Sequence, residues 1–549
     1  MADDERAIAF IKPEYLLQKA EKPYEDGMVL EVDCRSLKKP ENIPNLCGKL
    51  AKGGVCENTI CRYTHDVDEF IQKKPDELPF VCAFGTDCSF GIKCRLTHGP
   101  KTSEPLTNLL PPEVQTQLRK KKYDFKISDE YLRNLKIENA NQEKQELNND
   151  VENEKNLLDQ YIKPTIREEE AYKKKRRHDL FKSGNTYLAP LTTHGHVAFR
   201  RLCKHYGADI TCGEMSRATS VLQGKNSDWL CFKRHASESN FGIQIAAKHV
   251  DVLSRTCEVI RNHCTVDFVD LNLCCPIDSA YERGIGASLL PKKGHLEGMI
   301  KAMSTMLKYQ KPSHLSMDTS TRDPEEHMPL FSVKMRTGVK DGKNLAHSIL
   351  PILQDNDFDM ASIHGRSREQ RYSKLADWEY MNDCRKLCSD MAFFGNGDVT
   401  HYSEYEHHMQ QGFDGILIAR GALIKPWLFE EIKEKRHIDK SATERMEMIK
   451  LFMEYGMEHF GSDSVGIEKT RRFFCEWWSF GHRYVPFPIL ERVPHQINYR
   501  PQSFWGRNEL ETLMSSSNPS DWIRLSEIYL GPSDEKFTFK PKHKANSYK

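Results

Sequence analysis

Residues 268–276 read FVDLNLCCP, and this stretch decides the fold. Side chains alternate between the two faces of a β-strand, so Asp270 and Asn272 point one way while aliphatic residues point the other. The final proline cannot continue a strand ladder, so the strand ends just before it. Cys274 and Cys275 are therefore predicted at the carboxyl end of the strand, beside an acid and an amide. We therefore expect the reactive residues of the protein to lie at this end of the strand.

Seven more short apolar runs are also predicted to be strands, and segments with a helical pattern separate them. The eight runs begin at residues 186, 210, 241, 268, 331, 360, 391 and 415. Alternating strands and helices over roughly 250 residues are typical of a TIM barrel, the (β/α)8 architecture of the α/β class. We therefore predict such a barrel over residues 183–437. The one long gap follows the fourth strand, where residues 284–290 and the polar stretch 313–326 are predicted to form an inserted loop on the rim.

Length and composition set limits on the whole chain. Its 549 residues exceed the usual size of one domain. The net charge is +1, so nucleic-acid binding would need local basic patches. The amino end, MADDERAIAF, lacks the apolar core of a secretion signal, and no apolar run reaches the roughly 18 residues of a membrane helix. The 17 cysteines then indicate a reducing compartment, the cytoplasm or nucleus or both, and we expect a monomer that binds no membrane.

Two sets of cysteine and histidine precede the barrel. The ligands are Cys47, Cys56, Cys61 and His65 in the first set, and Cys82, Cys88, Cys94 and His98 in the second. Three thiolates and one imidazole complete a tetrahedral Zn²⁺ shell, and the metal would supply the folding energy that such short spans lack. Both sets resemble CCCH zinc fingers, a family that usually binds RNA. Aromatic and basic residues between the ligands suit base stacking and phosphate contact, although such fingers can also bind protein.

The remaining segments divide the chain further. We predict a polar segment over residues 1–40, the two zinc fingers over 41–100, a charged linker over 101–182, a helical RNA-binding domain over 438–535 and a basic tail over 536–549. Glu, Lys, Asn and Gln dominate the linker from Ile137 to Lys175, so we expect the linker to be solvated, whether helical or disordered. Its KKKRR cluster at 173–177 indicates a nuclear-import signal, an RNA-facing patch or a solvated helix face. The basic KTRR run at 469–472 is interpreted as part of an RNA-binding helix.

Polar side chains occupy inward positions of several predicted strands. Lys334 shares a strand face with the arginine two residues later. In FGIQIA, Gln244 lies on the opposite face from the two isoleucines, and in MASIHG, His364 ends the strand. Burying such groups without partners costs several kcal/mol, so they need a polar ligand or one another. Phosphate sites of TIM barrels favour the loops after strands seven and eight, which here read GNGDV at 395–399 and ARGA at 419–422. Together these features predict a phosphorylated cofactor.

Several of these motifs identify a family. APLTT, GEMSRA, FGIQIA, NLCCP, VKMRTG, HGRSREQRY, GNGDV and ARGALIKPWLF together resemble the tRNA-dihydrouridine synthase family over roughly Thr186 to Arg436. The tandem fingers, the run KTRRFFCEWW and the ending PKHKANSYK resemble the eukaryotic branch of that family, which acts on uridine 47 in the variable loop of tRNA.

The resemblance implies an FMN enzyme that takes electrons from NADPH and reduces uridine in tRNA, with messenger RNA left open as a second substrate. It implies hydride transfer from the reduced flavin to C6 of a flipped-out uracil, with Cys275 as the proton donor to C5. It also implies that Arg366, Gln370 and Tyr372 lie on the substrate side. The residues that it assigns to the cofactor are Pro190, Leu191, Thr192, Gln244, Asn272, Lys334, His364, Asn396, Gly397, Asp398, Ala419 and Arg420.

One residue departs from the family pattern. The family usually carries glycine before the cysteine–proline pair, whereas this chain carries Cys274. We assign the proton donor to Cys275 because it directly precedes the proline. Two other functions stay open from the sequence: an FMN barrel oxidoreductase acting on a small molecule, and a non-catalytic RNA-binding protein with CCCH fingers.

Overall fold

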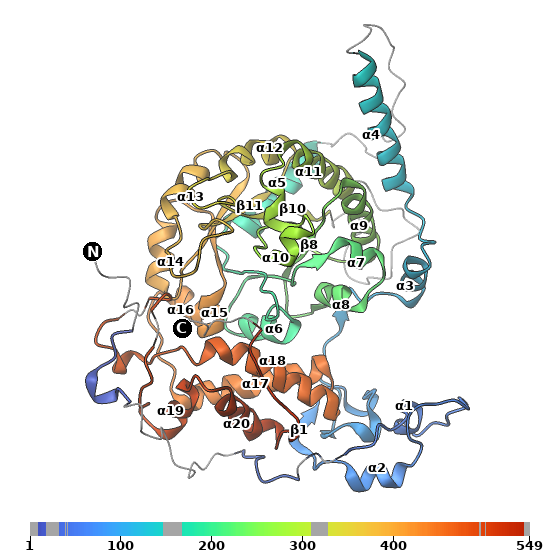
Figure 1. Cartoon of the computed structure of the whole chain (residues 1–549), viewed down its shortest axis with the longest axis vertical. Helices are drawn as coiled ribbons and strands as arrows, with labels where there is room; N and C mark the ends of the chain where they lie inside the picture. The colour runs from blue at the N-terminus through green and yellow to red at the C-terminus, as the bar shows by residue number, and fades with distance from the viewer. Residues whose placement is uncertain are drawn as a thin grey trace.

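The computed structural model describes residues 9–17, 32–38, 40, 42–145, 167–308, 328–493, 496–499 and 501–542. Eight parallel strands close into a barrel in the order β5-β4-β13-β12-β11-β10-β9-β8, and β8 pairs back with β5 (Figure 1). The strands are β4 (Tyr187–Leu188), β5 (Ile210–Cys212), β8 (Asn240–Ala246), β9 (Phe268–Leu273), β10 (Leu330–Arg336), β11 (Met360–His364), β12 (Ala392–Asn396) and β13 (Gly415–Ile418). Each of the eight predicted strands is present, and the TIM barrel is confirmed.

Helices surround the barrel as a βα repeat requires. The helices of this layer are α6 (Val197–His205), α7 (Ala218–Leu222), α8 (Asn226–Trp229), α9 (Val250–His263), α10 (Asp278–Glu282), α11 (Lys293–Lys308), α12 (Leu350–Asp355), α13 (Trp378–Arg385), α14 (Tyr402–Met409), α15 (Arg420–Ile424) and α16 (Leu428–Glu434). Residues 284–290 follow β9 at the carboxyl end of the barrel and contain the short helix η7 (Gly286–Leu289). The polar stretch 313–326 lies outside the described residues.

Side-chain alternation along β9 is as predicted. Phe268 belongs to the apolar cluster inside the barrel, and Val269, Leu271 and Leu273 pack outward against the surrounding helices. The inward aromatic ring of Phe268 meets Phe181 edge to face at 5.5 Å. Phe181 comes from the single turn of π-helix that precedes the first strand, and it is completely buried at the amino end of the barrel. This end is therefore closed by packing, which leaves the carboxyl end for chemistry.

The KKKRR cluster stabilises the closed end of the barrel instead of presenting a uniform basic face. It ends helix α5 (Arg167–Arg177). Lys173 and Arg177 form ion pairs with the fully buried Asp359 at 3.4 and 3.1 Å. Arg176 donates to the backbone carbonyl of Met328. Three of the five basic side chains therefore bind the barrel itself, and only the two lysines at 174 and 175 are exposed.

The charged linker is not solvated throughout, which corrects the sequence prediction. Helix α3 (Pro112–Arg119) and the first half of α4 (Lys126–Gln145) pack against the outside of the barrel, where Ile127 and Tyr131 join its apolar cluster. Ser128 is fully buried, and its backbone N–H donates to the carboxylate of Glu258 on α9 at 2.9 Å. A few apolar residues at helical spacing were enough to bind the segment, although polar residues dominate its composition. The part of the linker at 146–166 lies outside the described residues.

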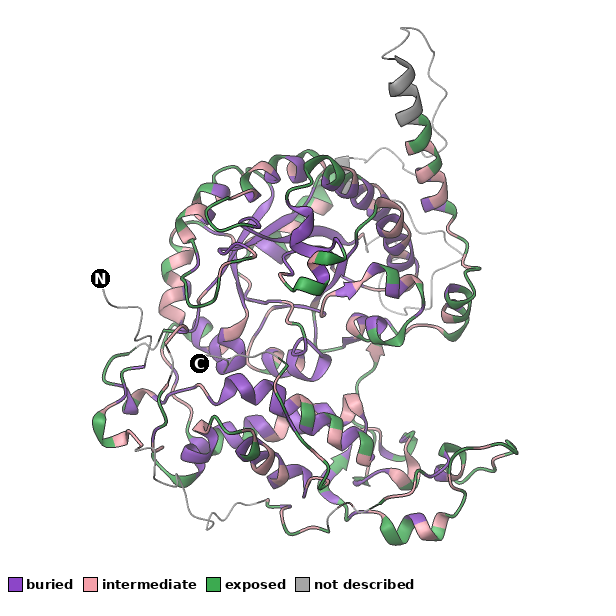
Figure 2. Ribbon diagram, in the orientation of Figure 1, coloured by how far each residue is buried: buried purple, intermediate pink, exposed green. Residues whose placement is uncertain are grey.

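A helical domain follows the barrel, as predicted. It consists of α17 (Ala442–Phe460), α18 (Ser464–Gly481), α19 (Glu509–Ser515) and α20 (Pro519–Leu530). Figure 2 shows that α17 and α18 are largely buried, since they pack on α6 and α15 of the barrel as well as on each other. Arg471 of the KTRR run is completely buried and donates to Ser526 Oγ and to the carbonyl of Gly531. It therefore cannot contact RNA, whereas Lys469 and Arg472 of the same run are exposed.

The two finger segments differ in how they attach. The first contains α1 (Gly48–Ala51) and α2 (Val67–Lys73), and the second contains β1 (Leu78–Cys82) and β2 (Leu96–His98). The second segment shares an apolar cluster with the helical domain, and Cys94 Sγ lies 3.0 Å from Ser462 Oγ at the start of α18. The first segment is more exposed and meets the second where Gly91 packs directly on the carbonyl of Ala51.

The amino-terminal segment binds the helical domain through short β-bridges. Ile11 pairs with Leu490, and Leu16 pairs with Phe504. Among the described residues, no helix is both long and apolar enough to cross a membrane.

The packing of the fingers predicts unequal effects on stability. Cys82→Ser should lower the Tm of the whole protein by several degrees, because Cys82 is 1% exposed in a cluster shared with the helical domain. Cys56→Ser, in the more exposed first finger, should leave the main unfolding transition in place. Differential scanning calorimetry measures both, with Cys388→Ser as the control for a barrel cysteine outside the two sets. Equal losses of Tm for Cys82→Ser and Cys56→Ser would contradict the unequal attachment.

Candidate active site

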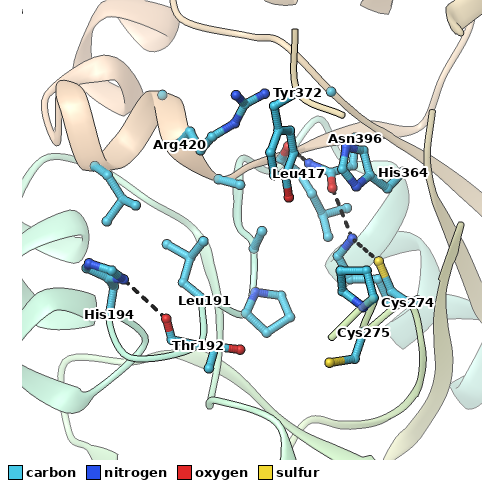
Figure 3. Close-up of a pocket in the computed structure, with 18 of the residues that line it drawn as sticks. Leu191, Thr192, His194, Cys274, Cys275, His364, Tyr372, Asn396, Leu417 and Arg420 are labelled. Atoms are coloured by element: carbon cyan, nitrogen blue, oxygen red, sulfur yellow. Dashed lines mark hydrogen bonds between the residues drawn. The ribbon is translucent and has the colours of Figure 1, made fainter. Parts of the chain in front are cut away.

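A cavity of about 420 Å³ opens at the carboxyl ends of the barrel strands (Figure 3). Its walls come from six of the eight strands, from the loops at the carboxyl ends of the strands, and from the helical domain. Every residue that the sequence assigned to cofactor or catalysis lines it: Pro190, Leu191, Thr192, Gln244, Asn272, Cys275, Lys334, His364, Asn396, Gly397, Asp398, Ala419 and Arg420. The fold therefore brings together, in one hollow, side chains that are separated by more than 200 positions in the sequence.

A line of hydrogen bonds crosses the barrel beneath this cavity. Ser332 Oγ donates to Asp270 at 2.6 Å, and Gln244 Nε2 donates to the other oxygen of the same carboxylate at 2.7 Å. Asn272 Nδ2 then donates to Gln244 Oε1 at 2.7 Å. Each member can bond in only one orientation, because the carboxylate can only accept. The carboxamide oxygen of Asn272 must therefore point towards the loop that follows β9.

The Asn272 oxygen holds that loop. It accepts hydrogen bonds from the backbone N–H groups of Cys274 at 3.1 Å and Cys275 at 3.0 Å. Leaving one buried N–H without an acceptor costs about 1–3 kcal/mol, so the pair fixes the loop strongly. At the head of the line, burial raises the pKa of Asp270 to about 6, although bonds from Ser332 and Gln244 oppose this rise. Both oxygens of Asp270 face donors, from Ser332 and Gln244, which is the arrangement of a carboxylate that only accepts.

Cys275 lies in an apolar corner of the cavity. Ala246, Ala280 and Ile285 surround it, and its side chain is almost completely buried. Burial raises the pKa of the Cys275 thiol above its ordinary value, an effect that the neighbouring Cys274 reinforces. The loop from 284 onwards closes over it: Gly286 has φ +66°, and a Cβ there would lie 2.9 Å from Cys275 Cβ. The thiol is therefore protonated at neutral pH and held in one place.

Cys274 faces a different part of the cavity. Its sulfur accepts a hydrogen bond from Lys334 Nζ at 3.6 Å, and the same ammonium donates to Asn396 Oδ1 at 3.0 Å (Figure 3). The carbonyl of Cys274 accepts from Arg336 Nε at 2.9 Å. A cysteine in place of the family's usual glycine is therefore accommodated by a lysine, and the two adjacent thiols have different surroundings.

Cations gather on the opposite wall. The carboxylate of Asp398 binds Arg366 at 2.6 Å and Arg420 at 2.8 Å, and both guanidinium groups lie over the ring of Tyr372. His364 stacks on the same ring. Burial, reinforced by the nearby cations, holds the pKa of His364 well below its ordinary value, so the imidazole is neutral. Since Arg366 Nη1 lies 3.2 Å from His364 Nε2 and can only donate, the proton of the neutral ring is on Nδ1.

The two glycine loops are tightly packed on their outer sides. A Cβ on Gly397 would lie 2.4 Å from Ala376 Cβ, and a Cβ on Gly421 would lie 2.2 Å from the carbonyl oxygen of Val399. Between them, Asp398 adopts the left-handed conformation at φ +51°, which aspartate tolerates better than most residues. No larger residue fits at either glycine, so the backbone of both loops forms the cavity wall.

The sequence analysis missed one side of the cavity. Phe480, Arg483 and Ile497 of the helical domain line the cavity, and nothing in their local sequence predicts this, because only the packing of two domains brings them there. Arg366 and Gln370, which the resemblance placed on the substrate side, are not among the lining residues. Arg366 is completely buried, and both side chains donate to carbonyls of their own loop.

Both predicted metal sets converge. In each set the four candidate ligand atoms, three sulfurs and one imidazole nitrogen, all lie within 4.8 Å of one another. Three thiolates and one imidazole are a donor set that Zn²⁺ prefers, and the geometry is compatible with one ion in each finger.

Comparisons with known proteins agree with this arrangement. The family described as "Dihydrouridine synthase (Dus)" matches residues 187–477. A Xenopus laevis protein named "tRNA-dihydrouridine(47) synthase [NAD(P)(+)]-like" is 41% identical, with 89% of this chain and 77% of the relative covered. A Homo sapiens protein of the same name is 39% identical over 89% of this chain and 78% of its own. A Coprinopsis cinerea protein named "tRNA-dihydrouridine(47) synthase [NAD(P)(+)]" is 38% identical over 92% of this chain and 87% of its own.

The environment of Cys275 predicts slow alkylation at neutral pH. Thiolates react with iodoacetamide and thiols do not, so a raised pKa moves the reaction to higher pH. The rate of labelling at Cys275, followed by tandem mass spectrometry of its peptide, should reach half its maximum at a higher pH in the native protein than in the urea-unfolded chain. A native midpoint at or below the unfolded one would show that the thiol is activated instead of protonated.

Proposed function

The chain belongs to the dihydrouridine synthase family, and on this premise we propose that it uses FMN and NADPH to reduce the C5–C6 double bond of uridine in tRNA. The observation that carries the proposal is the position of Cys275: a buried, protonated thiol at the end of β9, in a cavity whose other wall is cationic. The names of the relatives favour position 47 of tRNA as the target. Uridine in messenger RNA has the same reactive bond and is included in the proposal.

The residues of the cavity fit a phosphorylated flavin. A planar ring with several carbonyl and nitrogen acceptors needs donors on one side, and Gln244, Asn272 and Lys334 offer them from adjacent strands. A phosphate needs cations and close backbone, and Arg420 with the tightly packed loops at 395–399 and 419–422 would hold it. When bound and reduced, FMN supplies a hydride to C6 of uracil.

Cys275 holds the proton that completes the reduction. A hydride at C6 leaves negative charge that C5 must lose by protonation, so an acid must stand near C5 when the base is bound. A thiol whose pKa is raised by burial keeps its proton at neutral pH and gives it up only to a strong base. Asn272 keeps this thiol in place through the two N–H groups of the loop. We assign the substrate side of the cavity to Tyr372 and, from the helical domain, Phe480 and Arg483.

Lys334 and His364 would also orient the ring. The ammonium of Lys334 is already held by Asn396 Oδ1 and Cys274 Sγ, so its position is defined before a ligand arrives. His364 presents its Nδ1 proton as a donor, because Nε2 faces Arg366. Preorganised donors of this kind cost little reorganisation when charge develops on the ligand.

RNA must reach this cavity with one base out of its stack. We propose that both finger segments hold Zn²⁺ and that the first finger grips the RNA. Its Tyr63 is more than one-third exposed, and Arg62 donates to the Tyr63 hydroxyl at 3.0 Å while its guanidinium lies over the ring. A stacking surface beside a cation suits single-stranded bases. We propose a monomer that works in the cytoplasm, the nucleus or both.

The central test is the fate of the two thiols. The purified wild-type protein should be yellow with a flavin spectrum, and with NADPH it should form dihydrouridine in an unmodified tRNA transcript. Cys275→Ala should keep the flavin and bind the transcript but lose at least about 100-fold in turnover, the usual contribution of one general acid. Mass spectrometry of the digested RNA measures the product.

Cys274→Gly is the matched control, because it restores the residue that the family usually has. It should retain most of the turnover. Full activity of Cys275→Ala combined with a dead Cys274→Gly would reverse the assignment of the two thiols. A wild-type protein that neither contains nor takes up flavin would contradict the proposed function itself.

The first finger generates a separate prediction. Tyr63→Ala should weaken binding of the tRNA transcript by about 1–3 kcal/mol, the range for one base stacked on an aromatic ring, without changing the flavin spectrum. Tyr172→Ala, which removes an exposed tyrosine from α5 near the closed end of the barrel, is the control and should bind normally. Fluorescence anisotropy measures both affinities. Unchanged binding by Tyr63→Ala would remove the first finger from the RNA interface.

A further inference from the structure

The chain continues beyond α20 and crosses the helical domain. We call residues Lys536–Lys542 the strap. The strap, drawn in dark red in Figure 1, passes over α18 towards the barrel. At its end the backbone N–H of Lys542 donates to Glu476 Oε2 on α18 at 3.1 Å. A segment near the end of the chain is therefore fixed at a defined place.

Two aromatic residues bind the strap to the domain beneath it. The ring of Phe539 is 7% exposed and meets Trp522 of α20 edge to face at 6.1 Å. The ring of Phe537 lies under the guanidinium groups of Arg471 and Arg472, at 5.9 and 5.2 Å. From 537 to 542 the residues alternate between more buried and exposed positions. This period of two is typical of an extended chain with one face on the protein and the other in water.

The water-facing positions are cationic. Lys540 and Lys542 are both exposed on the strap, and Lys536 is exposed at its start. The apolar positions thus attach the strap, and the alternate positions display positive charge.

The strap ends beside the wall of the cavity. Glu476 binds the strap through its side chain. Its backbone oxygen accepts a hydrogen bond from His194 Nε2 at 3.1 Å, and His194 lines the cavity. Lys542 also acts electrostatically on Glu214. The carboxylate of Glu214 accepts from the backbone N–H of Thr193 at 2.8 Å, within the loop that forms this wall. The hydrogen bond to Glu476, whose backbone oxygen faces His194, therefore places the last described lysine near the loop at 190–194.

A base that enters the cavity carries its phosphates with it. The two phosphates that flank a flipped nucleotide stay outside the cavity, at its mouth, since only the base fits inside. Exposed lysines held beside the cavity wall can neutralise phosphates at the mouth, and such neutralisation is the main source of affinity in nucleic-acid complexes.

We propose that the strap presents Lys540 and Lys542 as contacts for the RNA phosphates next to the uridine that is reduced. This inference rests on the proposed function. It assigns the aromatic residues Phe537 and Phe539 a positioning role and the two lysines a direct role in binding substrate.

The test measures RNA binding by the full-length flavin-loaded protein. Lys540→Ala/Lys542→Ala should raise the Kd for an unmodified tRNA transcript about tenfold at low salt, and should reduce the slope of log Kd against log salt by about 1.5. The flavin content and the rate at which NADPH reduces the flavin should be unchanged, because neither lysine lines the cavity. Lys174→Ala/Lys175→Ala removes two exposed lysines at the closed end of the barrel and should leave both Kd and slope unchanged.

A second variant tests whether the lysines must be held in position by the strap or whether their positive charge is sufficient. Phe537→Ala/Phe539→Ala keeps both lysines but removes the anchors, and should weaken binding to a similar extent while the flavin content stays the same. Wild-type affinity and slope in Lys540→Ala/Lys542→Ala would overturn the proposal, as would an equal loss in Lys174→Ala/Lys175→Ala. Loss of flavin from the lysine variant would also overturn it, because the strap would then be part of the cofactor site. A wild-type protein that takes up no flavin would instead refute the proposed function.

Discussion

The active-site geometry depends on one carboxamide oxygen, that of Asn272. It accepts the N–H groups of both adjacent cysteines, and the line Ser332–Asp270–Gln244 fixes which way it points. The line begins at a buried carboxylate, which can only accept hydrogen bonds, so no member can turn round without losing a partner. The buried carboxylate of Asp270 thereby fixes, through Gln244 and Asn272, the position of the Cys275 thiol.

Period-two and βα patterns were enough to predict the barrel, its eight strands and the residues at their ends, because a parallel barrel places every strand end at one face. The thirteen residues assigned to cofactor and catalysis came from the family resemblance instead, and all of them line the cavity. Sequence patterns failed where a residue depends on packing between segments. Arg471 was interpreted as part of an RNA-binding run but is buried against Ser526, and Phe480 lines the cavity only because the helical domain packs on the barrel. The docking of α3 and α4 was hidden by their polar composition.

The segments outside the barrel form one continuous unit with it. The second finger shares its apolar cluster with the helical domain, which in turn completes the cavity wall through Phe480 and Arg483. The strap packs on this unit, and the first finger is its more exposed part. A chain with a net charge of +1 needs locally concentrated cations to bind RNA. Here some cations stabilise the closed end of the barrel, and others lie near the cavity, where we propose that they bind RNA. Lys334 is another such locally placed cation, since its ammonium donates to the sulfur of Cys274.

The account stands or falls on whether this chain makes dihydrouridine in cells. The most direct measurement is mapping of dihydrouridine, at single-nucleotide resolution, in RNA from cells that lack this protein. The account predicts that dihydrouridine at position 47 of tRNA disappears, and that it returns when the full chain is restored. An unchanged dihydrouridine map in those cells would contradict it.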